Sequence, residues 1–199
     1  MSNININKYF KFYQENESQF ISSIRYISVS IKCKCSFSIF YANLLMNICS
    51  DIEDILRAYF NLFSKRYNIR DFISRIKSDN NLKKIIDESV EFDNSDYGKI
   101  TPFQSIQYEN NQIPKWWQSY NKIKHDKMKS FSEASQENVL NSLAALYILN
   151  RYILISQDCK IDIFLEDKKY FNLTKYKSLC IGMGQIVVNV NKKMLFYGL

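Results

Sequence analysis

The sequence has few of the residues that interrupt regular structure, with four Gly and two Pro among 199 residues. It has many aromatic residues instead: fourteen Phe, fourteen Tyr and two Trp. Disordered chains are poor in aromatic residues, so this composition argues against disorder and favours packed regular elements. At 46% hydrophobic and 24% charged residues, the chain has the composition of an ordinary globular protein with one substantial core.

Features that direct a chain to export or to a membrane are also lacking. Residues 1–7 lack the charged start, the apolar run and the small-residue cleavage site of a secretory signal. We therefore expect no secretory signal and a cytoplasmic protein. The most apolar windows are residues 37–49 and 139–155. They are interrupted by Asn43, Asn47, Asn141, Asn150 and Arg151. Neither window is long and apolar enough to span a bilayer, so no membrane partner is expected.

Clustered metal ligands are absent from the sequence. There is one His and there are five cysteines, Cys33, Cys35, Cys49, Cys159 and Cys180, without a CxxC pair. An odd number of unpaired cysteines is typical of reduced thiols in the cytosol. The run Gly182-Met183-Gly184 precedes no predicted helix, so it indicates a hairpin turn and not a dinucleotide site. The sequence therefore predicts no metal and no cofactor.

The formal net charge is +7, which favours polyanionic partners through phosphate neutralisation and steering of association. Solvated lysine faces, which many basic proteins carry, account for the charge equally well. Charge alone therefore leaves RNA binding open.

Apolar residues recur every three or four positions over most of residues 1–156, which predicts helices. We expect helices at residues 7–31, 36–67, 71–76, 82–90, 114–128 and 131–155, with an irregular connection at 93–111. Pro114 suits a first helical turn, and the spacing of Ser130 and Glu133 suits a capping box. The sequence thus predicts an all-α bundle.

The pattern changes after Gln157 to short runs rich in β-forming residues. These runs cover residues 161–165, 178–182, 185–190 and 194–197, with turn residues between them. We therefore expect two domains: a helical bundle over residues 1–156 and a small antiparallel β appendage over residues 157–199.

Residues with reactive or charged side chains are most concentrated at positions 114–129. On a helix, Trp117, Asn121, Lys124, His125 and Met128 would share one side. Histidine ordinarily exchanges protons near neutrality, and His125 is the only one in the chain. Five lysines (Lys115, Lys122, Lys124, Lys127 and Lys129) against Asp126 indicate a positive surface that would attract phosphate. The pattern suits RNA cleavage through the 2′-hydroxyl.

Structural roles are the alternative for the same residues. A single His on a helix is more often a packing residue than a catalyst. Trp116 and Trp117 are better interpreted as core anchors than as platforms for stacked bases, because large aromatic side chains dominate burial.

Several short motifs resemble small bacterial HEPN-like proteins over about residues 100–155. They are Thr101-Pro102-Phe103, Pro114-Lys115-Trp116-Trp117, Tyr120-Asn121, Lys124-His125-Asp126, Phe131, Glu133-Ala134, Asn138-Val139 and Leu143-Ala144-Ala145-Leu146. The resemblance implies a bundle of at least four helices that forms a homodimer with the motif helices facing each other. It also implies metal-independent RNase activity in toxin–antitoxin, abortive-infection or other anti-phage systems, with RNA as substrate and an antitoxin or phage protein as a further partner.

Active relatives carry an Arg, a polar residue and, a few positions later, a His. Asn121 and His125 match the last two, whereas Tyr120 stands in the place of the Arg. The resemblance implies catalysis by His125 and Asn121, with Lys124 and Lys127 supplying charge. Lys115, Lys122, Lys129 and Tyr120 would contact RNA. The alternative is a non-catalytic module that binds RNA, a nucleotide or a protein.

Overall fold

The computed structural model describes residues 6–63, 67–92, 95–107 and 112–156, together with four short strands nearer the C-terminus. The structure is mostly helical with small antiparallel sheets. The α-helices are α1 (Ile6–Ser23), α2 (Ile39–Tyr59), α3 (Ile69–Ser78), α4 (Lys115–His125) and α5 (Gln136–Ser156). Four 3₁₀ helices, η1 (Ile31–Cys33), η2 (Leu82–Asp87), η3 (Gln104–Gln107) and η4 (Phe131–Glu133), lie between them.

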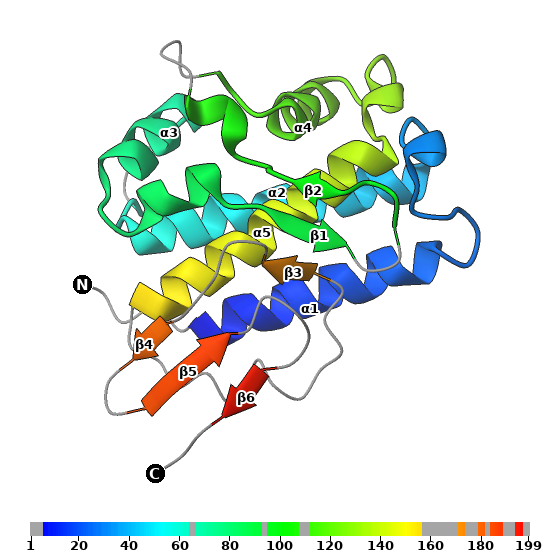
Figure 1. The fold of residues 1–199 in the computed structure, drawn as a ribbon. Coiled ribbons are helices and arrows are strands. Elements are labelled where there is room, and N and C mark those ends of the chain that lie inside the picture. The colour runs from blue at the N-terminus through cyan, green and yellow to red at the C-terminus, as the bar shows by residue number, and fades with distance from the viewer. Residues whose placement is uncertain are drawn as a thin grey trace.

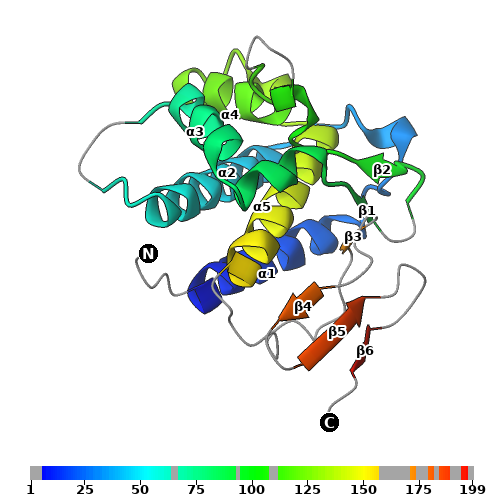
Figure 2. The same cartoon turned by 60° about the vertical axis from the view of Figure 1, so that its left-hand side comes forward.

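Helix α5 lies at the centre of the bundle and packs against α1, α2 and α4 (Figure 1). The turned view in Figure 2 shows the same arrangement, with α1 on one side of α5 and α2 and α4 on the other. Most side chains of α5 from Asn138 to Ile153 are buried, as a helix with neighbours on several sides requires. Even Asn150 is fully buried, and its amide donates to the carbonyl of Leu146 at 2.9 Å.

Helix α2 confirms the apolar stripe expected from the sequence, but it is shorter than the predicted residues 36–67. It begins after Ser38, whose side chain accepts the N–H of Tyr41 and so caps the first turn. It ends at Tyr59, where Asn61 adopts a positive φ of 55° that turns the chain away from the helix. Leu62 beyond this turn is still buried.

Helix α1 ends at Ser23, eight residues before the predicted end at Ile31. The hydroxyls of Ser22 and Ser23 donate to the carbonyls of Gln19 and Phe20, a local pattern that competes with helical bonding. The apolar residues that follow, Ile24 and Ile27, pack partly buried against the core without being helical.

The region after α2 differs from the prediction in two places. Helix α3 begins two residues earlier than predicted, after Asn68, which forms a capping box with Asp71, and it ends two residues later than predicted, at Ser78. The predicted helix at residues 82–90 is a 3₁₀ helix that ends at Asp87, and Val90 belongs to a strand. The carboxylate of Asp79 accepts the N–H groups of Asn81 and Leu82, which closes a tight turn before η2.

The strands form two small antiparallel sheets. Strand β1 (Val90–Phe92) pairs with β2 (Lys99–Ile100), so the predicted irregular connection contains a strand and the 3₁₀ helix η3. Strand β1 also pairs with β3 (Phe171–Leu173), with Val90 opposite Leu173. Strands β4 (Leu179–Ile181), β5 (Gly184–Val188) and β6 (Met194–Phe196) form the second sheet in that order.

The second sheet agrees with three of the β runs expected after Gln157, and the fourth run, residues 161–165, lies outside the described residues. The domain boundary at 156 stays a prediction, although the pairing of β1 with β3 joins one tail segment to the strand that follows η2. Among the described helices, none is long and apolar enough to cross a membrane.

Candidate functional site on helix α4

Two tryptophans fix the inward side of α4. Pro114 precedes the helix with a φ of −51°, which suits a first turn because proline loses no intrahelical bond there. Trp116 donates its indole N–H to the carbonyl of Pro102 at 2.9 Å. Trp117 packs beside Trp116 and Phe72, with ring centroids 5.1 and 6.4 Å away. Both indoles are 2% exposed, which confirms the prediction that they anchor the core.

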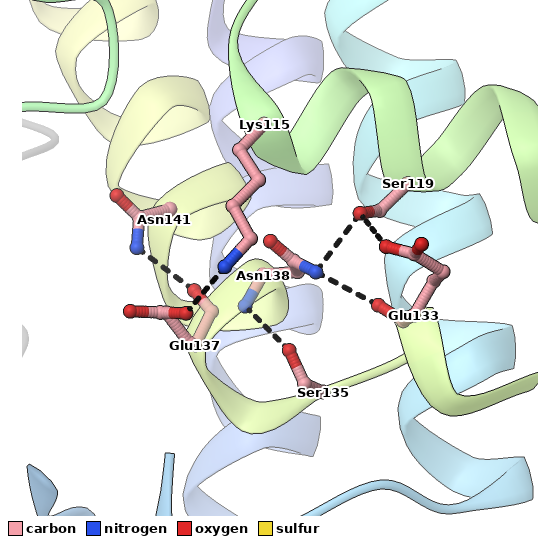
Figure 3. Close-up of polar contacts among 7 residues, drawn as sticks. All are labelled: Lys115, Ser119, Glu133, Ser135, Glu137, Asn138 and Asn141. Carbon is pink, nitrogen blue, oxygen red and sulfur yellow. Dashed lines mark hydrogen bonds and ion pairs between the residues drawn. The ribbon is translucent and has the colours of Figure 1, made fainter. Parts of the chain in front are cut away.

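A buried polar network joins α4 to the start of α5 (Figure 3). Ser119 Oγ donates to Glu133 Oε2 at 2.7 Å. Asn138 Nδ2 donates to Ser119 Oγ at 3.0 Å and to the carbonyl of Glu133 at 2.9 Å. Ser119 and Asn138 are buried, so their polar atoms would lose free energy without these partners. The network therefore fixes how α4 lies against α5.

Glu133 has a different role from the one that its spacing predicts. The capping-box prediction is wrong, because the side chain of Ser130 makes no capping hydrogen bond and α5 begins only at Gln136. Glu133 instead accepts from Lys122 and Ser119, and these bonds hold the pKa of its carboxyl below the ordinary value. A sequence signal for the network was present: Ser119 and Asn138 are polar residues at positions that helical periodicity assigns to the core.

Asn121 and His125 lie away from the core on α4. Asn121 is half-buried and His125 is exposed. Neither side chain has a recorded hydrogen bond to another described residue. Four positions apart on a helix, the two are neighbours on its surface. The prediction that Trp117 and Met128 share this side is wrong, because Trp117 points into the core and Met128 lies beyond the end of the helix, 88% exposed.

The five lysines around His125 have partners that a count along the sequence does not reveal. Four lie near acids: Lys115 with Glu137 at 3.0 Å, Lys122 with Glu133, Lys124 with Glu53 at 3.8 Å, and Lys129 with Asp126 at 3.3 Å. Lys127 donates to Asn43 Oδ1 at 2.8 Å. Because three of these acids come from α2, η4 and α5, the positive charge at the site is smaller than the sequence predicts. The lysines are largely exposed, so each pair contributes only about 0–1 kcal/mol and a phosphate could compete for the ammonium.

Tyr120, which stands where the resemblance would place an Arg, is a core residue whose hydroxyl reaches a polar partner. Its ring is 2% exposed, and its hydroxyl accepts from Lys124 Nζ at 3.0 Å. The ammonium also lies 5.0 Å from the centre of the ring. Burial raises the pKa of the Tyr120 hydroxyl, and the hydrogen bond to that hydroxyl raises the pKa of Lys124. Among the described residues, the Tyr120 hydroxyl contacts Lys124, and this hydrogen bond helps to hold the ammonium in place.

This arrangement can exchange a proton with a substrate but has little built-in affinity for a phosphate. The imidazole of His125 is accessible, and the amide of Asn121 can donate and accept. The last turn of a helix carries partial negative charge, so an anion at this end depends on the ammonium groups of Lys124 and Lys127. In the described ranges no three His, Cys, Asp or Glu side chains are grouped so as to hold a metal ion.

A second set of polar residues, which the sequence did not indicate, lies in the core around α5. Tyr13 on α1 donates to Glu17 Oε1, and Tyr152 on α5 donates to Glu88 Oε2, both at 2.5 Å. Glu17, Glu88 and Arg151 are all less than a tenth exposed. The bond of Tyr13 lies within α1, and its ring contacts that of Tyr147 on α5, with the centroids 5.4 Å apart. The bond from Tyr152 to Glu88 attaches the end of η2 to α5, and the burial of these side chains marks them as structural.

The chain has no counterpart among the known proteins with which it was compared. No protein-family model, no curated protein and no solved structure matches it. We therefore infer a function from the residues of α4 and their surroundings.

Proposed function

We propose that the chain is a HEPN-like protein of bacterial anti-phage defence or of a toxin–antitoxin system, and that it cleaves RNA without a metal ion. The observation that carries this proposal is the accessible imidazole of His125 beside the amide of Asn121, neither engaged by another described residue. Ser119, a structural side chain on α4, is buried and hydrogen-bonded. The exposed His125 and the half-buried Asn121, which lack such partners among the described residues, therefore favour a role toward a ligand.

In this proposal His125 removes the proton of the 2′-hydroxyl or protonates the leaving 5′-oxygen, and Asn121 donates to the phosphate. Lys124, held by Tyr120, and Lys127 stabilise the charge that builds on the phosphate. The exposed ammonium groups of Lys115, Lys122 and Lys129 would bind the RNA backbone by exchanging their present carboxylate partners for phosphates.

A homodimer with two facing α4 helices is part of the same proposal, because one copy offers a single imidazole for both acid and base. Light scattering should then report about twice the chain mass of 23.7 kDa. A stable monomer at micromolar concentration would count against a site shared between two copies. An antitoxin or phage protein that binds the dimer is the further partner proposed.

The direct test is cleavage of bulk RNA by the purified protein, by His125→Ala and by Asn121→Ala. Cleavage should be lost in the first variant and strongly reduced in the second, since removing a group that stabilises the transition state costs about 10²-fold or more. Lys83→Ala is the matched control, because Lys83 is an exposed lysine bound to Asn80 away from α4. A chelator should have no effect. Activity that survives His125→Ala, or that vanishes with chelator, would contradict the mechanism.

A non-catalytic module that binds RNA, a nucleotide or a protein is the second candidate. The observation that favours it is Tyr120, because a buried phenol occupies the place where active relatives present an Arg to the phosphate. The pairing of four of the five lysines with carboxylates points the same way. RNA binding that weakens as salt rises, with no cleavage under any condition, would select this candidate.

A further inference from the structure

Exposed apolar side chains are concentrated in the segment that joins α1 to α2. Among the described residues, five of the eight large hydrophobic side chains that are exposed fall between positions 26 and 40. They are Tyr26 at 87%, Ile31 at 51%, Phe37 at 49%, Ile39 at 67% and Phe40 at 41% exposure. Single exposed hydrophobic residues are normal, whereas a concentration of them marks a surface that another molecule covers. We call residues 22–41 the α1–α2 surface; it lies at the right of Figure 1.

This surface contains a pocket of about 300 Å³ between the end of α1 and the start of α2. Tyr26, Ile27, Phe40 and Tyr41 line it together with three serines, and its volume lies at the lower end of the range for ligand sites. The serine hydroxyls are already hydrogen-bonded within the chain: those of Ser22 and Ser23 donate to carbonyls of α1, and that of Ser38 accepts the N–H of Tyr41. An occupant would therefore meet mainly aromatic and aliphatic surface.

The charge on the α1–α2 surface has one sign. Residues 18–50 contain Arg25, Lys32 and Lys34 and no Asp or Glu. Arg25 directly precedes the pocket residue Tyr26, and both Arg25 and Lys32 are exposed, with no ion pair recorded to any described residue. The one carboxylate that the structure records bound to this stretch is Asp96, which accepts the backbone N–H of Ile31 at 2.7 Å. The complement of this surface is an acidic partner with an apolar anchor.

We propose that the α1–α2 surface docks a protein segment in which a large hydrophobic side chain is flanked by acidic residues. The hydrophobic side chain enters the pocket, and the acidic residues approach Arg25 and Lys32. A pocket favours this occupant over a membrane, because a hollow lined by Tyr26, Ile27, Phe40 and Tyr41 can accept a single large side chain of a partner protein. The proposal does not depend on RNA cleavage at His125.

The test is a titration of the isotope-labelled protein, followed by NMR, with a short synthetic peptide that has one Trp between acidic residues. The NMR signals of residues 22–41 should shift. Replacing the peptide Trp by Ala should weaken binding at least about tenfold, which corresponds to about 1.4 kcal/mol, and so should replacing the peptide's acidic residues by Lys. The protein variants Tyr26→Ser and Arg25→Glu should weaken binding of the original peptide in the same way.

Two matched control variants distinguish binding at the α1–α2 surface from non-specific attraction to exposed hydrophobic or basic side chains. Phe63→Ser removes another aromatic side chain, 75% exposed, that does not line the pocket, and Lys83→Glu reverses a charge elsewhere; both should leave binding unchanged. All four substituted side chains are exposed, so the variants should fold, which circular dichroism checks. Absence of shifts in residues 22–41 at millimolar peptide would overturn the proposal. The proposal would also be overturned if the peptide did not bind and phosphatidylglycerol vesicles, or an RNA oligonucleotide, bound in a way that requires Tyr26 and Arg25.

Discussion

The inward and outward sides of α4 differ in how their side chains are held. On the inward side, Trp116, Trp117, Ser119 and Tyr120 are each 2% exposed or less, and three of them bond to other elements or to Lys124. On the outward side, Asn121 and His125 have no recorded hydrogen bond to a described residue. Conspicuous residues in one short motif can therefore differ in their surroundings: Trp116, Trp117, Ser119 and Tyr120 build the fold, whereas Asn121 and His125 lie toward the surface.

The largest loss of stability should come from Trp117→Ala, on the inward side of α4. Removing a buried indole that packs on Phe72 and Trp116 leaves a cavity, so the free energy of unfolding should fall by about 3–5 kcal/mol. Denaturant unfolding monitored by circular dichroism measures the change. A loss below about 1 kcal/mol would show that the inward side of α4 does not anchor this helix to the core.

A smaller loss should follow Asn138→Ala, which removes the donor to Ser119 Oγ and to the carbonyl of Glu133. Because these groups are largely buried, the variant should lose about 1–3 kcal/mol of unfolding free energy. Asn141→Ala is the matched control on the same helix, since the hydrogen bond of its amide among the described residues goes to the carbonyl of Glu137 one turn back. Equal losses in the two variants would contradict a specific link between α4 and α5.

The same network predicts a dependence of stability on pH. The bonds from Lys122 and Ser119 lower the pKa of Glu133 in the folded state, from an ordinary value of 4.5 that the unfolded chain retains. The stabilisation is therefore fully present above the unfolded value and is lost as the pH falls through the lower folded value. The stability advantage of the wild type over Glu133→Gln should shrink from neutral pH to about pH 3. An advantage that is constant with pH, or that grows on acidification, would contradict this assignment.

Among the substitutions on the inward side of α4, the smallest loss of stability should come from Tyr120→Phe, which keeps the buried ring and removes the hydroxyl that Lys124 contacts. We expect a loss of about 0.5–1.5 kcal/mol and a lower pKa of Lys124, because that hydrogen bond is the main cause of its raised value. NMR titration of the Lys124 amine checks the pKa. Tyr26→Phe, at an 87% exposed tyrosine, is the control and should change neither quantity.

The sequence predicted the elements of the bundle better than their ends or their contacts. The apolar stripe of α2 and the start of α4 after Pro114 follow from periodicity and from the missing N–H of proline, and both are confirmed. The end of α1 depends on serine hydroxyls that donate to nearby carbonyls, and the end of α2 depends on the positive φ at Asn61. The spacing of apolar residues indicates neither.

The helix that carries the candidate site could be predicted from the sequence, but its facing and its surroundings could not. The segment with Asn121 and His125 is helical, as its spacing predicts, but the two residues do not share a side with Trp117, which is buried. The pairing of its lysines with Glu53, Glu133 and Glu137 depends on tertiary packing between elements far apart in the sequence. A charge count within one segment therefore overestimated its positive field.

Whether the outward side of α4 is catalytic is decided by RNA cleavage and thermal unfolding of His125→Ala, measured on the same samples beside the wild type. His125 is exposed, with no recorded hydrogen bond to a described residue, so its loss should change the free energy of unfolding by no more than about 0.5 kcal/mol, which moves the melting temperature by at most a few degrees. Cleavage should disappear. If the variant instead melted far lower, and the wild type showed no cleavage under any condition, His125 would be a structural residue and the outward side of α4 would not be a catalytic surface.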